Sequence, residues 1–122
     1  MSILPRFDLP AGRAVTLAGA PEGHDARLLA ELVRSDARTL LHVALDDGRA
    51  ARLSDLVAFY APEIEIVSFP AWDCLPYDRV SPNVELVGQR IAALGKLLTE
   101  PARKRLVVAT VNGAVQRVPP RE

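Results

Sequence analysis

The sequence has little of what a disulfide, a metal site or an aromatic core would need. One cysteine, Cys74, stands among 122 residues, so that no internal disulfide can form and a reducing compartment is expected. With only two histidines besides, the chain lacks the several ligands at fixed spacing that a zinc site requires. Aromatic residues make up 5%, and the core must therefore be built from leucine, valine, isoleucine and alanine.

An excess of one charge and a long apolar run are also missing. Fifteen basic residues balance fifteen acidic ones, which removes the basic excess expected of an autonomous nucleic-acid binder. No apolar stretch approaches the ~18–20 residues that span a membrane. The first residues, Met1 to Pro5, lack the basic and apolar regions of a signal peptide. We therefore expect a soluble, cytoplasmic domain with no membrane partner.

Apolar runs typical of strands alternate with helical patterns along the whole chain. A serine and a proline, Ser81 and Pro82, are expected to open the third helix, and Pro101 to end it. The predicted strands are 14–17, 39–45, 63–69 and 105–111, and the predicted helices are 22–35, 48–60, 81–100 and 112–116.

This alternation predicts an α/β fold, a parallel sheet with helices on both faces. Four such strands followed by the start of a helix look like a larger fold cut short, and we expect a fragment of a multidomain protein. The residues expected in the core are Leu17, Leu41, Val43, Ile66, Val87, Ile91, Leu94, Val107 and Val108.

The turn after the first strand is the place where α/β sheets bind phosphates. A phosphate loop reads glycine, four residues, then Gly-Lys and Ser or Thr. Counted from Gly19, those last three positions hold His24, Asp25 and Ala26. An aspartate in place of the lysine repels phosphate, and a methyl group replaces the hydroxyl that binds magnesium. The loop is degenerate, and we expect no nucleotide, metal or catalytic residue in it.

A dinucleotide site on the same turn is the alternative. Gly19 and Gly23 flank it, and Asp46 ends the second strand, where an acid would hold a ribose hydroxyl. The Gly-x-Gly-x-x-Gly pattern is absent, Pro21 occupies the turn, and Glu22 faces the position of a pyrophosphate. A small nucleotide- or dinucleotide-binding enzyme that uses the Gly19–Gly23 turn therefore remains the competing hypothesis.

The loop from Phe69 to Pro82 concentrates the single tryptophan, a tyrosine and three prolines. Stiff aromatic loops of this kind usually pack against a neighbouring domain or shape a site. We expect Trp72 and Tyr77 to anchor the loop on the domain, and Asp78 and Arg79 to be presented as candidate interaction residues.

At this loop the sequence resembles a known family. The pattern Trp72-Asp73-x-Leu75-Pro76-Tyr77-Asp78-x-x-Ser81-Pro82, followed by Arg90, resembles the N-terminal region of bacterial transcription-repair coupling factors. The segment 107–118 is similar to the same family, and the resemblance runs from about residue 12 to the end.

The resemblance implies a fold related to the first domain of the excision nuclease B subunit. Residues 13–122 would then form an incomplete RecA- or helicase-like (P-loop NTPase-like) α/β domain, preceded by an extension at 1–12. In that subunit a working phosphate loop and a long β-hairpin act on nucleotide and damaged DNA. This chain lacks both, since Tyr77-Asp78 passes to Ser81-Pro82 with no room for a hairpin.

The resemblance also implies a function, that of a non-catalytic scaffold and interaction module. The parent protein would be an ATP-dependent DNA translocase (an ATP hydrolase) that displaces stalled RNA polymerase from duplex DNA and recruits the A subunit of the excision nuclease. ATP and magnesium would belong to the separate motor domains of the parent and not to these residues. The partners of this segment would be other domains of the same chain.

Overall fold

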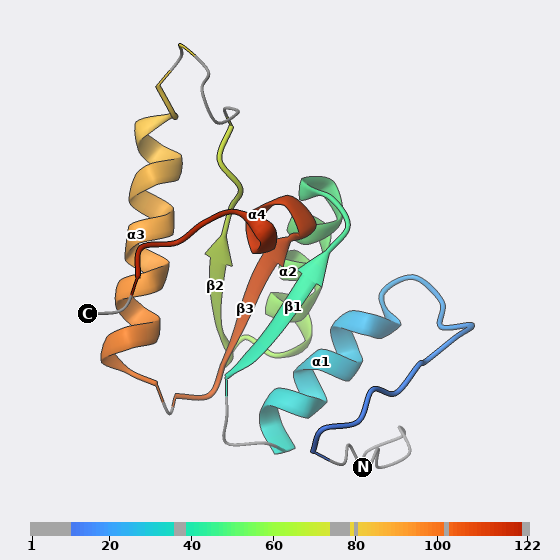
Figure 1. Ribbon diagram of the computed structural model, residues 1–122. Coiled ribbons are helices and arrows are strands. Elements are labelled where there is room, and N and C mark those ends of the chain that lie inside the picture. Colours follow the sequence, from blue (N-terminus) through green and yellow to red (C-terminus); the bar gives the residue numbers. More distant parts are fainter. Residues whose placement is uncertain (1–10, 36–38, 74–78, 80, 102, 121–122) are drawn as a thin grey trace.

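The computed structural model describes residues 11–35, 39–73, 79, 81–101 and 103–120. Within them, helices and strands alternate as the sequence predicts from the second strand onward (Figure 1). The elements are α1 (His24–Ser35), β1 (Leu40–Ala44), α2 (Asp47–Tyr60), β2 (Glu65–Phe69), α3 (Val84–Thr99), β3 (Arg105–Thr110) and α4 (Val111–Val115).

The three strands form one parallel sheet in the order β1-β3-β2. The central strand β3 is buried along its whole length, as its unbroken apolar run after Arg105 predicts for a strand covered on both faces. In register, Leu41 of β1 pairs with Val107, which in turn pairs with Val67 of β2. The predicted α/β class with a parallel sheet is confirmed.

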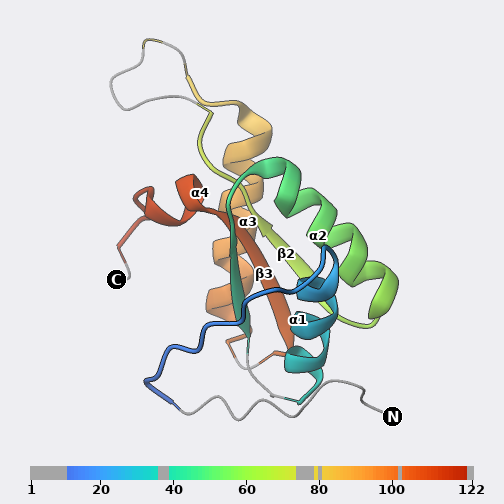
Figure 2. The same ribbon diagram turned by 90° about the vertical axis from the view of Figure 1, so that its right-hand side faces the viewer.

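Helices cover both faces of this sheet. On one face α1 and α2 pack together over β3, around Val33, Val57 and Val108, and Figure 2 shows the two helices on the same side of the strands. On the other face α3 packs on β2 and β3, where Ala93 contacts the row of Val67 and Val107. Alternation of side chains along β3 separates the two clusters.

The predicted strand at 14–17 is wrong for this structure. Residues 13–18 adopt no regular structure, and Val15 and Leu17 are exposed. A strand needs a partner that accepts its backbone hydrogen bonds, and the sheet of the described residues contains only β1, β2 and β3. The apolar composition is that of a strand, but the segment has no paired neighbour.

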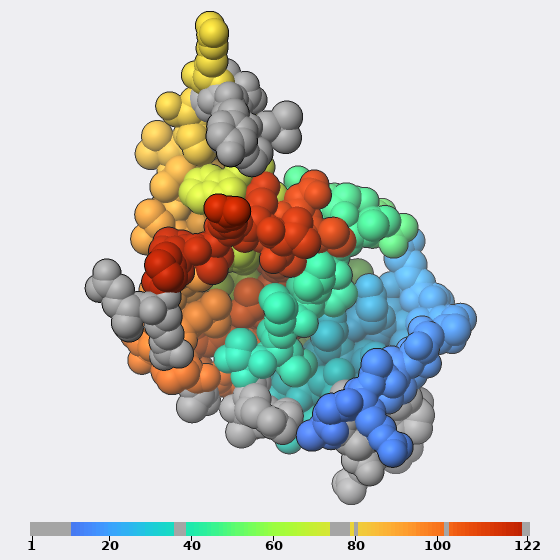
Figure 3. Space-filling model, in the orientation of Figure 1, coloured from blue at the N-terminus to red at the C-terminus, as the bar shows by residue number. Residues whose placement is uncertain are grey.

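The predicted core is partly confirmed and partly wrong. Val107 and Val108 are buried, while Ile66, Val87 and Leu94 are partly buried. Four further residues predicted to be buried are exposed instead: Leu17, Leu41, Val43 and Ile91. Leu41 and Val43 lie on the face of the sheet that α3 covers, but α3 reaches only β2 and β3, and Figure 3 shows β1 at the surface on that side.

The start of α3 differs from the prediction by two residues. Asn83, and not Ser81, caps the helix, because its side-chain oxygen accepts a hydrogen bond from the Glu85 N–H at 2.9 Å. The same device starts α2, where the Asp46 carboxylate accepts from the Arg49 N–H at 2.8 Å. Asp46 is thus the N-cap of α2 and lies in an exposed turn.

A group of charged side chains joins the end of α3 to the starts of β2 and β3. Arg105 is fully buried and donates to the carbonyl oxygens of Lys96 (3.1 Å) and Glu100 (2.7 Å), which are among the last carbonyls of α3. Its guanidinium also meets the Glu100 carboxylate at 3.2 Å. Glu65, at the start of β2, pairs with Lys96 at 3.0 Å and Arg103 at 3.3 Å.

These pairs should make stability depend on acid pH. The hydrogen bond from Lys96 lowers the pKa of Glu65, helped by the charges of Arg103, Lys96 and Arg105, although burial opposes it. The hydrogen bond from Arg103 likewise lowers the pKa of Glu100. A carboxylate with a depressed folded pKa stabilises the fold above its ordinary value of 4.5, and the contribution is lost as pH falls through the folded pKa.

The melting midpoint, followed by circular dichroism from about pH 7 to about pH 3, should therefore fall most steeply below the ordinary glutamate pKa. The double variant Glu65→Gln/Glu100→Gln should flatten that fall. Glu85→Gln, at the opposite end of α3, is the matched control and should reproduce the wild-type curve. An unchanged slope in the double variant would contradict this assignment.

Candidate functional site

The segment predicted to be a degenerate phosphate loop forms a turn in the structure. Gly19 and Gly23 have positive φ angles of 75° and 86°, a conformation that favours glycine. The His24 N–H donates to the Pro21 carbonyl oxygen at 3.1 Å, and α1 begins at His24. The chain thus turns directly into the N-terminus of α1, but no strand precedes the turn in the described residues.

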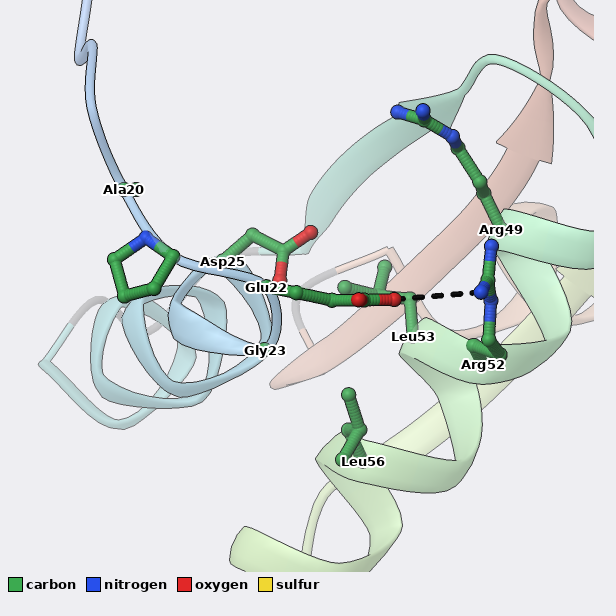
Figure 4. A pocket seen from close by; sticks show the side chains of 9 residues that line it. Ala20, Glu22, Gly23, Asp25, Arg49, Arg52, Leu53 and Leu56 are labelled. Carbon is green, nitrogen blue, oxygen red and sulfur yellow. Dashed lines mark ion pairs between the residues drawn. The ribbon is translucent and has the colours of Figure 1, made fainter.

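A hollow of about 550 Å³ lies between this turn and α2 (Figure 4). Glu22 and Asp25 come from the turn and the first residues of α1, and Arg49 and Arg52 come from α2. The Glu22 carboxylate crosses the hollow to Arg52 at 3.3 Å, the pair drawn as a dashed line in Figure 4. The remaining lining residues are Ala20, Pro21, Gly23, Leu53 and Leu56.

At the positions where a phosphate loop has lysine and a hydroxyl, this turn has Asp25 and Ala26. The Asp25 carboxylate accepts from the neighbouring Ala26 N–H at 2.8 Å and so occupies a donor at the start of α1. Ala26 is fully buried in the core below and offers neither hydroxyl nor ammonium. One of the two arginines is already paired with Glu22. The four predicted residues Gly19, His24, Asp25 and Ala26 are brought together, but as a structural turn and helix start.

Sequence reasoning missed the arginines of this hollow. Arg49 and Arg52 follow the turn by more than twenty residues and belong to no motif. Their spacing of three does place them on one face of α2, which is the signal that was available. Only the packing of α1 on α2 shows that this face looks toward Glu22.

A second set of functional candidates surrounds Arg90 of α3. Its side chain is 2% exposed, and its guanidinium carbon lies 4.2 Å from the centroid of the Phe69 ring and 4.7 Å from that of Trp72. Nη1 donates to the Pro70 carbonyl oxygen at 2.7 Å. Burial lowers the pKa of Arg90. A cation held between two aromatic rings fixes the start of the loop onto α3.

Two further hydrogen bonds hold the described ends of this loop. The Trp72 N–H donates to Oε1 of Gln116 at 2.6 Å, and Asp73 accepts from the Asn83 N–H at 3.1 Å. Trp72 is partly buried, which agrees with its predicted role as an anchor, and Arg79 is exposed. Tyr77 and Asp78, the other predicted loop residues, lie outside the described residues, as does Cys74. The sequence places Arg90 only in the pattern shared with the family and does not predict its contacts with Phe69 and Trp72.

The two histidines lie apart from any catalytic arrangement in the described structure. His42 is half-buried on β1, and burial lowers its pKa, which keeps the ring neutral. His24 starts α1.

Among the described residues, no group of three or more His, Cys, Asp or Glu side chains lies close enough to hold a metal ion. In that same part of the chain, none of the helices has the length and apolar character to cross a bilayer.

The described residues define an α/β domain with a parallel three-stranded sheet and a hollow between the Gly19–Gly23 turn and α2. No family model matches the chain. Comparison with curated proteins finds transcription-repair-coupling factors. The chain is 29% identical to that of Escherichia coli (strain K12) over 117 residues, which is 94% of this chain and 10% of the relative.

Two other relatives have the same name. The Haemophilus influenzae protein is 30% identical over 98 residues, 80% of this chain and 8% of its own length. The Rickettsia bellii protein is 28% identical over 90 residues, 74% of this chain and 8% of its own length. The chain is thus homologous to a segment of transcription-repair-coupling factors, and it spans about a tenth of the length of these relatives.

Proposed function

We propose that these residues form a non-catalytic scaffold and interaction module at the N-terminus of a transcription-repair coupling factor. The observation that carries the proposal is the hollow beside Gly19–Gly23. A glycine turn leads into the start of α1 there, Asp25 and Ala26 stand where a phosphate loop would need lysine and a hydroxyl, and Glu22 lies against Arg52. A RecA-like architecture that has lost its nucleotide chemistry accounts for both features.

For the whole parent protein we propose the activity that the sequence resemblance implies. It would be an ATP-dependent DNA translocase of the cytoplasm, with ATP and magnesium bound in separate motor domains. Its partners would be RNA polymerase, duplex DNA and the A subunit of the excision nuclease. These 122 residues would contribute by packing against other domains of the same chain.

A titration with nucleotides tests the module directly. The chain should show no heat of binding with Mg-ATP, ADP or NAD at concentrations up to about 1 mM, a range that detects even weak sites. The physical reason is that a triphosphate entering the hollow would face the carboxylates of Glu22 and Asp25, while Arg52 already pairs with Glu22 and Arg49 with Asp46.

If a nucleotide does bind, the variant Arg52→Ala shows whether it binds in the hollow. Arg117→Ala, which lies outside the hollow, is the matched control. Micromolar binding that disappears in Arg52→Ala and persists in Arg117→Ala would overturn the scaffold proposal. The result would then favour the alternative, a nucleotide- or dinucleotide-binding enzyme that uses the Gly19–Gly23 turn.

A further inference from the structure

Helix α3 has two apolar faces, and the domain uses only one of them. The buried face contacts the sheet through Ala93 and Leu97. The second face carries Val84, Ile91 and Leu98, whose exposed fractions are 84%, 64% and 56%. These three residues are spaced by seven, so that they form one line along the helix.

The second face is also free of charge. The charged residues of α3 are Glu85, Arg90 and Lys96. At 100° per residue, Glu85 and Lys96 point together to a third side of the helix, and Arg90 is buried against the loop. A solvated helix face normally carries the charges, as the opposite side of an amphipathic helix does. An uncharged line of exposed valine, isoleucine and leucine is the pattern of a face that another element covers.

Two glycines lie on the same line. Gly88 and Gly95 fall between Val84, Ile91 and Leu98, and a Cβ added at either glycine would meet nothing within 4 Å. Glycine inside a helix is less favourable than alanine, and the described part of the domain gives no steric reason for it here. Glycines seven residues apart do allow the backbone of a second helix to approach closely.

We propose that the line Val84–Gly88–Ile91–Gly95–Leu98 is the docking surface for a second helix, supplied by the part of the parent chain outside these 122 residues. Repetition every seven residues matches a helix, because a facing helix meets side chains at that period. The parent chain is the favoured source because the relatives are about ten times longer than this chain. The inference rests on the proposal that these residues are one module of such a protein.

Cysteine reactivity tests the docking. Ile91→Cys should react freely with a maleimide in the 122-residue chain, and about tenfold or more slowly in the full-length parent, where the helix would cover it. Gln89→Cys, on an exposed position of the other side of α3, is the matched control and should react equally in both. Peptide mass spectrometry measures the labelling of each site in the presence of other cysteines.

The glycines provide a second test, because replacing them should stabilise the 122-residue chain but disrupt the docking in the full-length protein. In the 122-residue chain, Gly88→Ala/Gly95→Ala should raise the melting midpoint by about 3–6 °C, since alanine favours the helix and the space is open. In the full-length protein the same pair should restore maleimide reactivity at Ile91→Cys, because the added methyl groups separate the two helices.

Equal reactivity of Ile91→Cys in the two proteins would overturn the docking inference and leave the nucleotide result of the proposed function untouched. Protection in the short chain that grows with its concentration would also overturn it, because a second copy would then be the occupant. A native gene product of only 122 residues would instead refute the proposed function itself.

Discussion

Replacing Arg105 by alanine should lower the free energy of unfolding by about 3–5 kcal/mol, the range for removing one partner of a buried ion pair. The guanidinium is fully buried and satisfies the carbonyl oxygens of Lys96 and Glu100 at the end of α3. It also lies beside the carboxylates of Glu65 and Glu100. Without the guanidinium, the carbonyl oxygens at the end of α3 lose their hydrogen-bond donor next to the start of β3.

Urea unfolding measured by circular dichroism gives this free energy. Arg103→Ala is the matched control, because Arg103 belongs to the same cluster and is mostly exposed, and exposed ion pairs contribute little. Arg105→Met fills the volume without donors and should be nearly as damaging as Arg105→Ala. If methionine restored wild-type stability, the packing of the side chain and not its hydrogen bonds would be what holds α3.

Trp72→Ala and Arg90→Ala should each lower the free energy of unfolding by about 2–4 kcal/mol. Trp72 and Phe69 enclose the Arg90 guanidinium, which also binds the Pro70 carbonyl. Because the two residues share one interaction, the double variant should cost about 1–2 kcal/mol less than the sum of the single variants.

Asp73→Ala is the control within the loop and should have a small effect, because its hydrogen bond to the Asn83 N–H is exposed. Arg90→Lys keeps the charge but not the planar group that stacks on both rings, and should recover only part of the loss. A Trp72→Ala protein with an unchanged melting midpoint would argue instead that the tryptophan contacts a domain outside this chain.

The sequence was sufficient for the class of fold because alternating strands and helices have few solutions. It was insufficient to predict which face of α3 packs against the sheet. The predicted core includes Val87, Ile91 and Leu94 of this helix. The structure places Ala93 and Leu97 against the sheet and exposes Ile91. A helix that is apolar on two sides does not show by its own periodicity which side the sheet will cover.

The sequence likewise predicted only those features of the candidate site that depend on residues close together in the chain. The loss of phosphate chemistry was readable because Asp25 and Ala26 occupy known positions of a local motif. The roles of Arg52, Arg90 and Arg105 were not, since each depends on residues distant in the chain. Arginine is mostly exposed in proteins, and nothing local in the sequence distinguishes the buried Arg90 and Arg105 from the exposed Arg103.

The position of β1 at the end of the sheet has a consequence for handling the chain by itself. Its residues Leu40–Ala44 include no Lys, Arg, Asp or Glu, and its outward Leu41 and Val43 are exposed. An uncharged strand at the edge of a sheet is a template onto which another chain can add a strand. The opposite edge, β2, begins with Glu65 and lies under α3. Any self-association of the purified chain should therefore begin at β1, and the substitution Leu41→Lys should reduce it.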